Sequence, residues 1–306
     1  MIDKDNGNLK EVEYPVFHFT ERHKCVCCGS NDLSIVMERE FVESCVFDFI
    51  NEYYKGKITK NSLGDHKYTI ARCNECKFLF QKYILDSDGM FYLYENVIDP
   101  IHSLNKKERA PYSQFRDILK SASVVVEFFP GRKPREVSVL DFGMGWGHWA
   151  VAASALGLMV KGVELSQQRI LFAKQKGVDV ITDFKNDETK FDFINTDQVF
   201  EHLEDPLDTG KILYDKLNQG GILKIFVPNG SNAENDLNRP GWQASKNHLH
   251  PLEHINCFNW NSLNMLAKRL NLRPATASDF KKLRSKLRAL RQLHFIRNPS
   301  WYFVKD

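Results

Sequence analysis

The sequence contains no apolar run that approaches the roughly 18 residues of a membrane-spanning helix, and its best candidate, residues 124–129, is far too short. Internal repeats, low-complexity segments and a recognisable signal peptide are also missing. Charges nearly balance, with a formal net charge of +3. We therefore expect a soluble, cytoplasmic chain, whose 306 residues leave room for a small metal-binding module and one full domain.

Four of the seven cysteines form two C-x-x-C pairs, Cys25 with Cys28 and Cys73 with Cys76. Each pair places two sulfurs on one side of a tight turn, and four thiolates match the tetrahedral coordination of zinc. Because all four ligands would be cysteine, no position remains for water, and the metal should be structural. A redox pair or disulfides are the alternatives, and the missing signal peptide disfavours them.

Strand-like segments at 67–71 and 77–83 flank the second pair, in the outline of a zinc ribbon. We predict a zinc-binding module with a polar N-terminal tail over residues 1–85. Three cysteines remain outside the predicted ligand set. Cys27 lies inside the first pair and could substitute for a neighbour, whereas Cys45 and Cys257 are interpreted as buried thiols.

Prolines at intervals mark a connector over residues 86–136, within which 112–128 has a helical pattern. The aromatic run at 90–94 could form a flap over a cofactor. Aromatic side chains at this density more often belong to a core, so we interpret the run as packing.

A glycine-rich run follows the apolar strand expected at 137–140 and precedes a helix expected from His148. Such a loop lets the backbone turn tightly and approach a nucleotide-type cofactor at a helix N-terminus. A dinucleotide fingerprint would place its third glycine at position 148, so the spacing disfavours NAD. The residues of interest are Asp141, Gly143, Gly145 and Gly147.

Further strands are expected at 159–163, 178–181, 191–195 and 222–227, with helices opening at 197–203 and covering 211–218. This βαβαβ order predicts a parallel sheet. Glu164 ends the second strand, where a carboxylate can accept hydrogen bonds from both ribose hydroxyls.

An acidic residue followed by G-x-G-x-G resembles motif I of class I S-adenosylmethionine-dependent methyltransferases. The strings FDFINTDQVFEHLEDP and LNQGGILKIFVPN resemble the fourth-strand and fifth-strand segments of that family. The resemblance implies an α/β fold, with a Rossmann-like seven-stranded methyltransferase domain over residues 137–306. It also implies S-adenosylmethionine as cofactor, held by Asp141, Gly143, Gly145, Gly147, Glu164, Asp183 and Gln198.

Methyl transfer usually needs a base for the acceptor, and histidines cluster after the fifth strand. Glu253-His254, followed by an aromatic residue and Ser262-Leu263, resembles the acceptor side of bacterial sugar methyltransferases that carry a four-cysteine zinc module. The resemblance implies a small-molecule or saccharide acceptor, with His254 as general base. Glu253 or Asn256 would fix the sugar, and His202 is a second catalytic candidate.

Sugar C-methyltransferases have a tyrosine where this sequence has Pro251, and a further C-terminal domain that would follow Asp306. Oxygen methylation is therefore the simpler expectation, with carbon methylation as the alternative.

Seven basic residues and no acidic one lie within 281–297, interleaved with leucines at helical spacing. We interpret this pattern as a basic amphipathic helix before a last strand at 301–304. Its basic face is either simply solvated or contacts an anionic partner, such as a sugar-nucleotide diphosphate, nucleic acid or a membrane surface.

Other functions are weighed against the same residues. A nucleic-acid amino-methyltransferase would show Asn/Asp-Pro-Pro-aromatic where this chain has Asn195-Thr196-Asp197-Gln198, and a pyrimidine carbon-5 enzyme would need a Pro-Cys nucleophile. An RNA methyltransferase using the zinc module and the basic helix stays an alternative. So does a non-enzymatic interaction module that only binds the cofactor.

Overall fold

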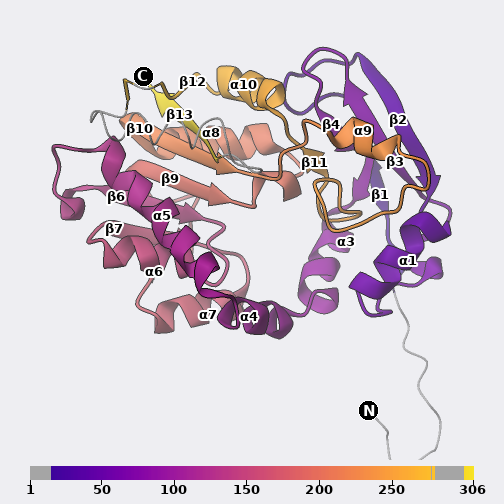
Figure 1. Cartoon of the computed structure of the whole chain (residues 1–306), viewed down its shortest axis with the longest axis horizontal. Helices are drawn as coiled ribbons and strands as arrows, with labels where there is room; N and C mark the ends of the chain where they lie inside the picture. Colours follow the sequence, from indigo (N-terminus) through magenta and orange to yellow (C-terminus); the bar gives the residue numbers. More distant parts are fainter. Residues whose placement is uncertain (1–14, 277, 280–299) are drawn as a thin grey trace, which may run out of the picture.

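The computed structural model describes residues 15–276, 278–279 and 300–306. Two sheets lie side by side along the long axis of the molecule, a seven-stranded sheet and a four-stranded sheet nearer the N-terminus (Figure 1). Within these described ranges, no helix has the length and apolar character required to cross a membrane.

The large sheet has the strand order β12-β13-β10-β9-β6-β7-β8. The strands from β10 to β8 are parallel to one another, but β13 runs antiparallel to both of its neighbours, so the sheet is mixed. The seven-stranded α/β prediction is confirmed, and the expectation of a purely parallel sheet is corrected at this edge. The bounds are β6 Ser138–Phe142, β7 Met159–Val163, β8 Asp179–Val180, β9 Phe191–Asp197, β10 Leu217–Phe226, β12 Leu272–Pro274 and β13 Ser300–Lys305.

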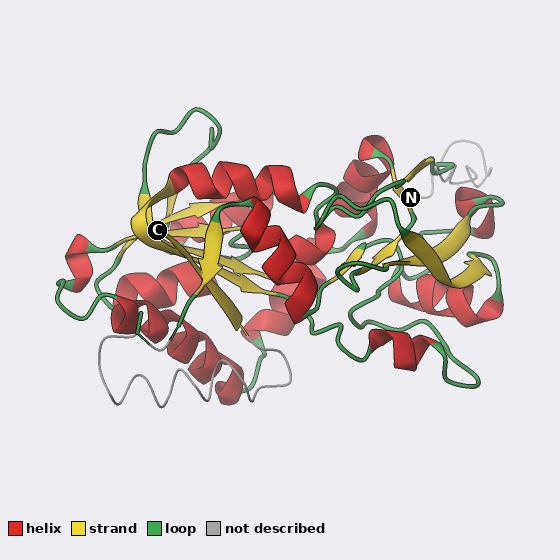
Figure 2. Cartoon of the chain, turned by 90° about the horizontal axis from the view of Figure 1, so that it is seen from above, coloured by secondary structure: helices red, strands yellow, loops and turns green. Residues whose placement is uncertain are grey.

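Helices cover both faces of this sheet (Figure 2). On one face, α5 and α6 pack apolar side chains against β6, β9 and β13, and α7 packs beside α6. On the other face, α8 and α10 bury leucines against β6 and β10. The bounds are α5 Tyr112–Phe128, α6 His148–Ala155, α7 Gln167–Gln175, α8 Pro206–Lys216 and α10 Trp260–Arg269.

Two predicted boundaries around α8 were wrong. The helix expected from residue 197 is only a 3-10 turn over Phe200–His202, and α8 starts at Pro206. The side chain of Asp205 accepts hydrogen bonds from the first turn of α8, which makes it the cap. The strand expected at 222–227 begins earlier, because β10 starts at Leu217 and runs through Gly220 and Gly221.

The four-stranded antiparallel sheet has the order β11-β4-β3-β2. Its edge strand β11 comes from the C-terminal half of the chain, so the two predicted domains share a sheet. A separate pair, β1 with β5, and the helices α1 and α2 complete this part of the molecule. The bounds are β1 Phe19–Glu21, β2 Leu33–Glu40, β3 Lys67–Cys73, β4 Leu79–Gln81, β5 Tyr83–Leu85, β11 Asn256–Cys257, α1 Ser44–Tyr53 and α2 Lys60–Leu63.

The predicted connector is mostly helical. It contains α3 (Ser87–Tyr92), a π-helical turn over Leu93–Val97 and α4 (Pro100–Glu108), and then continues into α5, whose predicted bounds are confirmed. A 3-10 turn at Pro134–Glu136 leads into β6, and α9 (Ala233–Leu237) follows β10.

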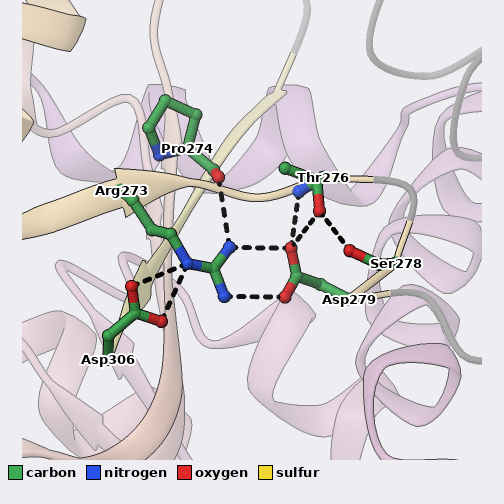
Figure 3. Close-up of polar contacts among 6 residues, drawn as sticks. All are labelled: Arg273, Pro274, Thr276, Ser278, Asp279 and Asp306. Carbon is green, nitrogen blue, oxygen red and sulfur yellow. Dashed lines mark hydrogen bonds and ion pairs between the residues drawn. The ribbon is translucent and has the colours of Figure 1, made fainter.

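Ion pairs fix the edge of the large sheet at β12 (Figure 3). The guanidinium of Arg273 makes a two-pronged pair with Asp279, both N···O distances being 2.9 Å, and its Nε lies 2.8 Å from Asp306. This arrangement fixes the end of β12 beside β13. The basic segment predicted at 281–297 lies outside the described residues.

Candidate functional site

The glycine loop leaves the carboxyl end of β6 and turns into α6. Gly143, Gly145 and Gly147 all have left-handed φ angles, of 70°, 56° and 73°. At Gly143 the requirement is also steric, since a Cβ atom there would lie 2.6 Å from the side chain of Val199. Gly147 is the N-cap of α6, so the first N–H groups of the helix have no partner within the helix itself.

Glu164, at the end of β7, lies directly beside this loop. Its Oε2 accepts a hydrogen bond of 2.9 Å from the Gly145 N–H, and its Oε1 accepts from the N–H groups of Leu165 and Ser166. The guanidinium of Arg169 lies 3.8 Å away. The structure thus places the predicted ribose-binding carboxylate at the glycine loop.

Asp141 lies beneath the loop and is only 2% exposed. Its Oδ1 accepts a hydrogen bond of 2.7 Å from Asn195, whose own Oδ1 accepts one of 2.7 Å from Lys224. Burial raises the pKa of Asp141 to about 7. Its carboxyl group therefore supports the loop from inside the sheet.

The other predicted cofactor residues lie at the same carboxyl edge of the sheet. Asp183 is exposed, accepts a hydrogen bond from Asn186 and lines a hollow of about 400 Å³ beside β8. Gln198 follows β9 with a φ of 56°, and its backbone N–H donates to the Phe226 carbonyl. Gln198 precedes Val199, the residue that contacts Gly143, so the end of β9 adjoins the glycine loop.

A buried polar group, which we call the histidine cluster, follows Val199. It consists of four buried residues, Glu201, His250, Glu253 and His254, and of His202, which is half-buried. The rings of His202 and His254 are 4.8 Å apart and nearly perpendicular, and His250 lies 5.4 Å from His254. The predicted catalytic residues His202, Glu253 and His254 are therefore brought together. His202 lies three residues after Val199, whose side chain adjoins Gly143 of the glycine loop.

Backbone carbonyls determine the tautomers of two of these histidines. His254 Nδ1 lies 2.5 Å from the Asn247 carbonyl oxygen, and His202 Nδ1 lies 2.9 Å from that of Glu253. A carbonyl oxygen can only accept, so both Nδ1 atoms carry the proton and both Nε2 atoms have a free lone pair. Burial lowers the pKa of His254 to about 4 and that of His202 to about 3, so both rings are neutral.

The N-terminal sheet positions the turn that carries His250 and His254. Gln81, in β4, donates from Nε2 to the carbonyls of both histidines, at 2.9 and 3.0 Å. The Tyr54 hydroxyl donates to Glu253, at 2.9 Å. Leu252 adopts a strained φ of 70° in the same turn. The catalytic candidates are thus held by both halves of the chain.

Asn256 also connects the two halves. Its Oδ1 accepts two hydrogen bonds of 3.0 Å from the buried guanidinium of Arg22, and its Nδ2 donates to the carbonyls of Phe200 and Leu203. These contacts fix the turn that carries Glu201 and His202. Because Asn256 is 1% exposed and fully engaged, the expectation that it could bind a sugar is corrected.

The four predicted zinc ligands meet at one point. Their sulfurs all lie within 4.8 Å of one another, with Cys25 3.5 Å from Cys76 and Cys28 3.4 Å from Cys73. All seven cysteines are free, which excludes the disulfide alternative in this structure. The donor set and its spacing fit a tetrahedral metal centre with four thiolates.

The two cysteine turns have the same backbone pattern. In each, the N–H four residues after the first cysteine donates back to its carbonyl, from Gly29 to Cys25 and from Lys77 to Cys73. Gly29 and Lys77 both have left-handed φ angles, of 83° and 59°. This repeated turn brings each pair of sulfurs to the same side.

Helix α10 contacts both cysteine turns. At its start, Asn259 donates to the Lys77 carbonyl at 2.7 Å, and at its end Arg269 donates to the carbonyls of Val26 and Cys27. The same helix covers the large sheet. The two cysteine turns are therefore attached to the domain that carries the glycine loop.

Sequence reasoning missed three residues of the site. Glu201 is fully buried beside His202, and within the described residues neither of its carboxylate oxygens has a hydrogen-bond partner. Tyr54 contacts Glu253, and the Tyr94 hydroxyl lies 3.1 Å from His202 Nδ1. Tyr94 belongs to the aromatic run interpreted as packing, so that interpretation was incomplete. The one available signal was Glu201 itself, an acidic residue directly between Phe200 and His202.

Comparison with known proteins gives one family match. The profile of a family described as methyltransferase domain matches residues 113–277, just over half of the chain. No curated protein sequence matches the chain.

Three solved structures are similar to this chain at low sequence identity. The plantazolicin methyltransferase BpumL in complex with SAH has a TM-score of 0.49 and 18% identity, covering 71% of this chain and 93% of its own. A SAM-dependent methyltransferase from Archaeoglobus fulgidus has a TM-score of 0.42 and 15% identity, covering 67% and 98%. A TehB-like SAM-dependent methyltransferase from Corynebacterium glutamicum has a TM-score of 0.42 and 20% identity, covering 68% and 100%.

Proposed function

Because the chain belongs to the methyltransferase domain family and is an S-adenosylmethionine-dependent enzyme, we propose that it methylates a hydroxyl group of a saccharide. The acceptor is a sugar nucleotide or a unit of a surface polysaccharide. What supports a saccharide is the combination of a four-cysteine module with the Glu253-His254 segment, which the N-terminal sheet holds through Gln81.

The glycine loop and its neighbours would hold the cofactor. The N–H groups at the start of α6 and the loop glycines accommodate the amino-acid part, and Glu164 accepts hydrogen bonds from the ribose hydroxyls. We assign contacts with the adenine to Asp183, and Gln198, at the end of β9, is a further cofactor-binding residue. Asp141 supports the loop from below. Bound there, S-adenosylmethionine supplies the methyl group and a sulfur leaving group.

The position of His254 is the observation that supports deprotonation of the acceptor hydroxyl by a general base. Its Nδ1–H is fixed by the Asn247 carbonyl, so the Nε2 lone pair has a defined direction inside the cluster. We place the acceptor hydroxyl at this lone pair, which would take its proton. His202 borders the same space, and Glu253 is held by Tyr54, so both would orient the acceptor.

We also propose that the four cysteines bind one structural zinc ion. Among the described residues, the group consists of the four cysteines alone. Four thiolates complete a tetrahedral zinc site and leave no position for a substrate. Its role is to fix the two cysteine turns against α10, and through them the N-terminal sheet that positions the histidine cluster.

The test combines a binding measurement with a transfer assay. S-adenosylhomocysteine is titrated calorimetrically into the zinc-loaded chain, and labelled methyl transfer is measured on a panel of sugar nucleotides. His254→Asn keeps a donor for the Asn247 carbonyl but removes the Nε2 lone pair, and should lower turnover about a hundredfold with unchanged cofactor affinity. His18→Asn, at an exposed position, is the matched control.

Unchanged turnover in His254→Asn would contradict the assignment of that residue. Methylation of RNA in a salt-sensitive manner, with no saccharide modified, would instead favour the RNA methyltransferase alternative. Binding of S-adenosylhomocysteine with no acceptor of either class would favour a non-enzymatic role.

A further inference from the structure

Three side chains that can act as metal ligands converge inside the histidine cluster. One ligand atom from each of Glu201, His202 and His254 lies within 4.8 Å of the other two. Glu201 is fully buried, and both of its oxygens lack a partner among the described residues. A buried carboxyl group is seldom left without a partner, and two imidazoles lie beside this one. The space between these side chains is therefore complementary to a cation.

The hydrogen bonds around the cluster are those that prepare imidazoles as metal ligands. The Nδ1–H of His254 donates to the Asn247 carbonyl and that of His202 to the Glu253 carbonyl. A ligating histidine commonly donates its second N–H to a carbonyl in this way, which fixes the ring and directs the other nitrogen. These contacts leave the Nε2 atom of each ring without a proton.

We propose that Glu201, His202 and His254 bind one divalent transition-metal cation, which takes the oxygen of the acceptor hydroxyl as a further ligand. This inference rests on the function proposed above. Two imidazoles and one carboxylate are a donor set for Mn²⁺, Fe²⁺, Co²⁺ or Zn²⁺. Donors around such an ion are roughly 3–4 Å apart, so the three side chains close slightly on binding.

The two metal centres would then differ in kind. The four-cysteine centre is closed and soft, whereas three protein donors in the histidine cluster leave positions open for substrate. His250, although buried nearby, is not among the three converging donors. An open centre next to the glycine loop has the arrangement of a catalytic metal rather than a structural one.

The cation would activate the acceptor hydroxyl directly, because a metal-bound hydroxyl group is far more acidic than a free one. Its proton would pass to a solvent water, and the oxygen lone pair would form the new bond to the methyl carbon. The sulfur keeps the electron pair of the bond that breaks. In this arrangement the His254 lone pair is a metal ligand, which replaces the general-base role proposed above.

Manganese is the probe, because it prefers oxygen and nitrogen donors and leaves the four-thiolate centre loaded with zinc. The full chain, with its zinc content measured before and after, is titrated with Mn²⁺ while electron paramagnetic resonance reports the free ion. We expect one Mn²⁺ per chain for the wild type and at least about tenfold weaker binding for Glu201→Gln. Glu204→Gln, three residues away and exposed, should bind like the wild type.

Glu201→Gln removes a buried carboxyl group without changing its shape, and circular dichroism checks that the variant is folded. Absence of Mn²⁺ binding in the wild type, or equal binding in Glu201→Gln, overturns the inference. Methyl transfer to saccharides that persists in protein holding one zinc per chain and no other metal, with that zinc lost in Cys73→Ser, would also overturn it while leaving the proposed function intact. Mn²⁺ binding at Glu201 without transfer to any saccharide would support the metal site and refute the acceptor class.

Discussion

The backbone N–H of Gly145 donates a 2.9 Å hydrogen bond to the Glu164 carboxylate, which joins the glycine loop after β6 to the end of β7. The carboxylate is also held by the N–H groups of Leu165 and Ser166. It therefore needs no rearrangement to meet a ribose, because a carboxylate can accept more hydrogen bonds than these.

Replacing Glu164 with Ala should weaken S-adenosylhomocysteine binding by roughly ten- to a hundredfold, since charge-assisted hydrogen bonds of this kind contribute about 1.5–3 kcal/mol. Calorimetric titration measures the change. Glu188→Ala, at an exposed position before β9, serves as the control and should bind like the wild type. Equal affinities in both variants would remove Glu164 from the cofactor site.

Metal removal is predicted to act beyond the cysteine turns. Cys73→Ser deletes one ligand of the proposed zinc, and α10 contacts both turns through Asn259 and Arg269. We expect loss of one zinc per chain and a fall in Tm of about 10 °C, measured by metal analysis and thermal unfolding. Cys45 lies outside the four-cysteine cluster, so Cys45→Ser should change neither the zinc content nor the Tm. A Cys73→Ser protein that retains zinc and its Tm would argue against a four-cysteine centre.

The Arg22–Asn256 contact should matter for acceptor chemistry rather than for cofactor binding. Asn256→Ala leaves the buried Arg22 guanidinium without an acceptor and frees the carbonyls of Phe200 and Leu203. We expect a loss of about 2–4 kcal/mol in the free energy of unfolding, together with lower turnover.

Affinity of this variant for S-adenosylhomocysteine should stay within about threefold of wild type. Urea unfolding and calorimetry measure the two quantities, and Asn235→Ala, at an exposed position in α9, is the control. A large loss of cofactor affinity at unchanged stability would contradict this division of roles.

The local patterns predicted most of the large sheet and the four converging cysteines. Periodicity located β7 and α5 at their observed bounds, and C-x-x-C spacing identified the ligand set. Local patterns could not show that β11 completes the N-terminal sheet, because that pairing joins Cys257 to Leu79 across the whole chain. For the same reason, the contacts of Tyr54 and Gln81 with the histidine turn had no sequence signal.

The pH dependence of stability should reveal Asp141. Burial is the main cause that raises its pKa to about 7, and the hydrogen bond from Asn195 only partly opposes this. In the unfolded chain the carboxyl group has its ordinary pKa of 3.8, so between pH 3.8 and about 7 only the folded state holds the proton. The contribution of Asp141 is therefore complete below the unfolded pKa and is lost as the pH rises towards 7.

Asp141→Asn keeps the shape and an acceptor for Asn195 but cannot titrate. From about pH 5.5 to about pH 7, the free energy of unfolding of the wild type should fall by about 2 kcal/mol relative to that of the variant. Urea unfolding of the zinc-loaded, cofactor-free proteins gives both curves, and pH values in this window keep the cysteine ligands metal-bound. Parallel curves would mean that Asp141 is already ionised beneath the loop, with Lys224, through Asn195, as its balancing charge.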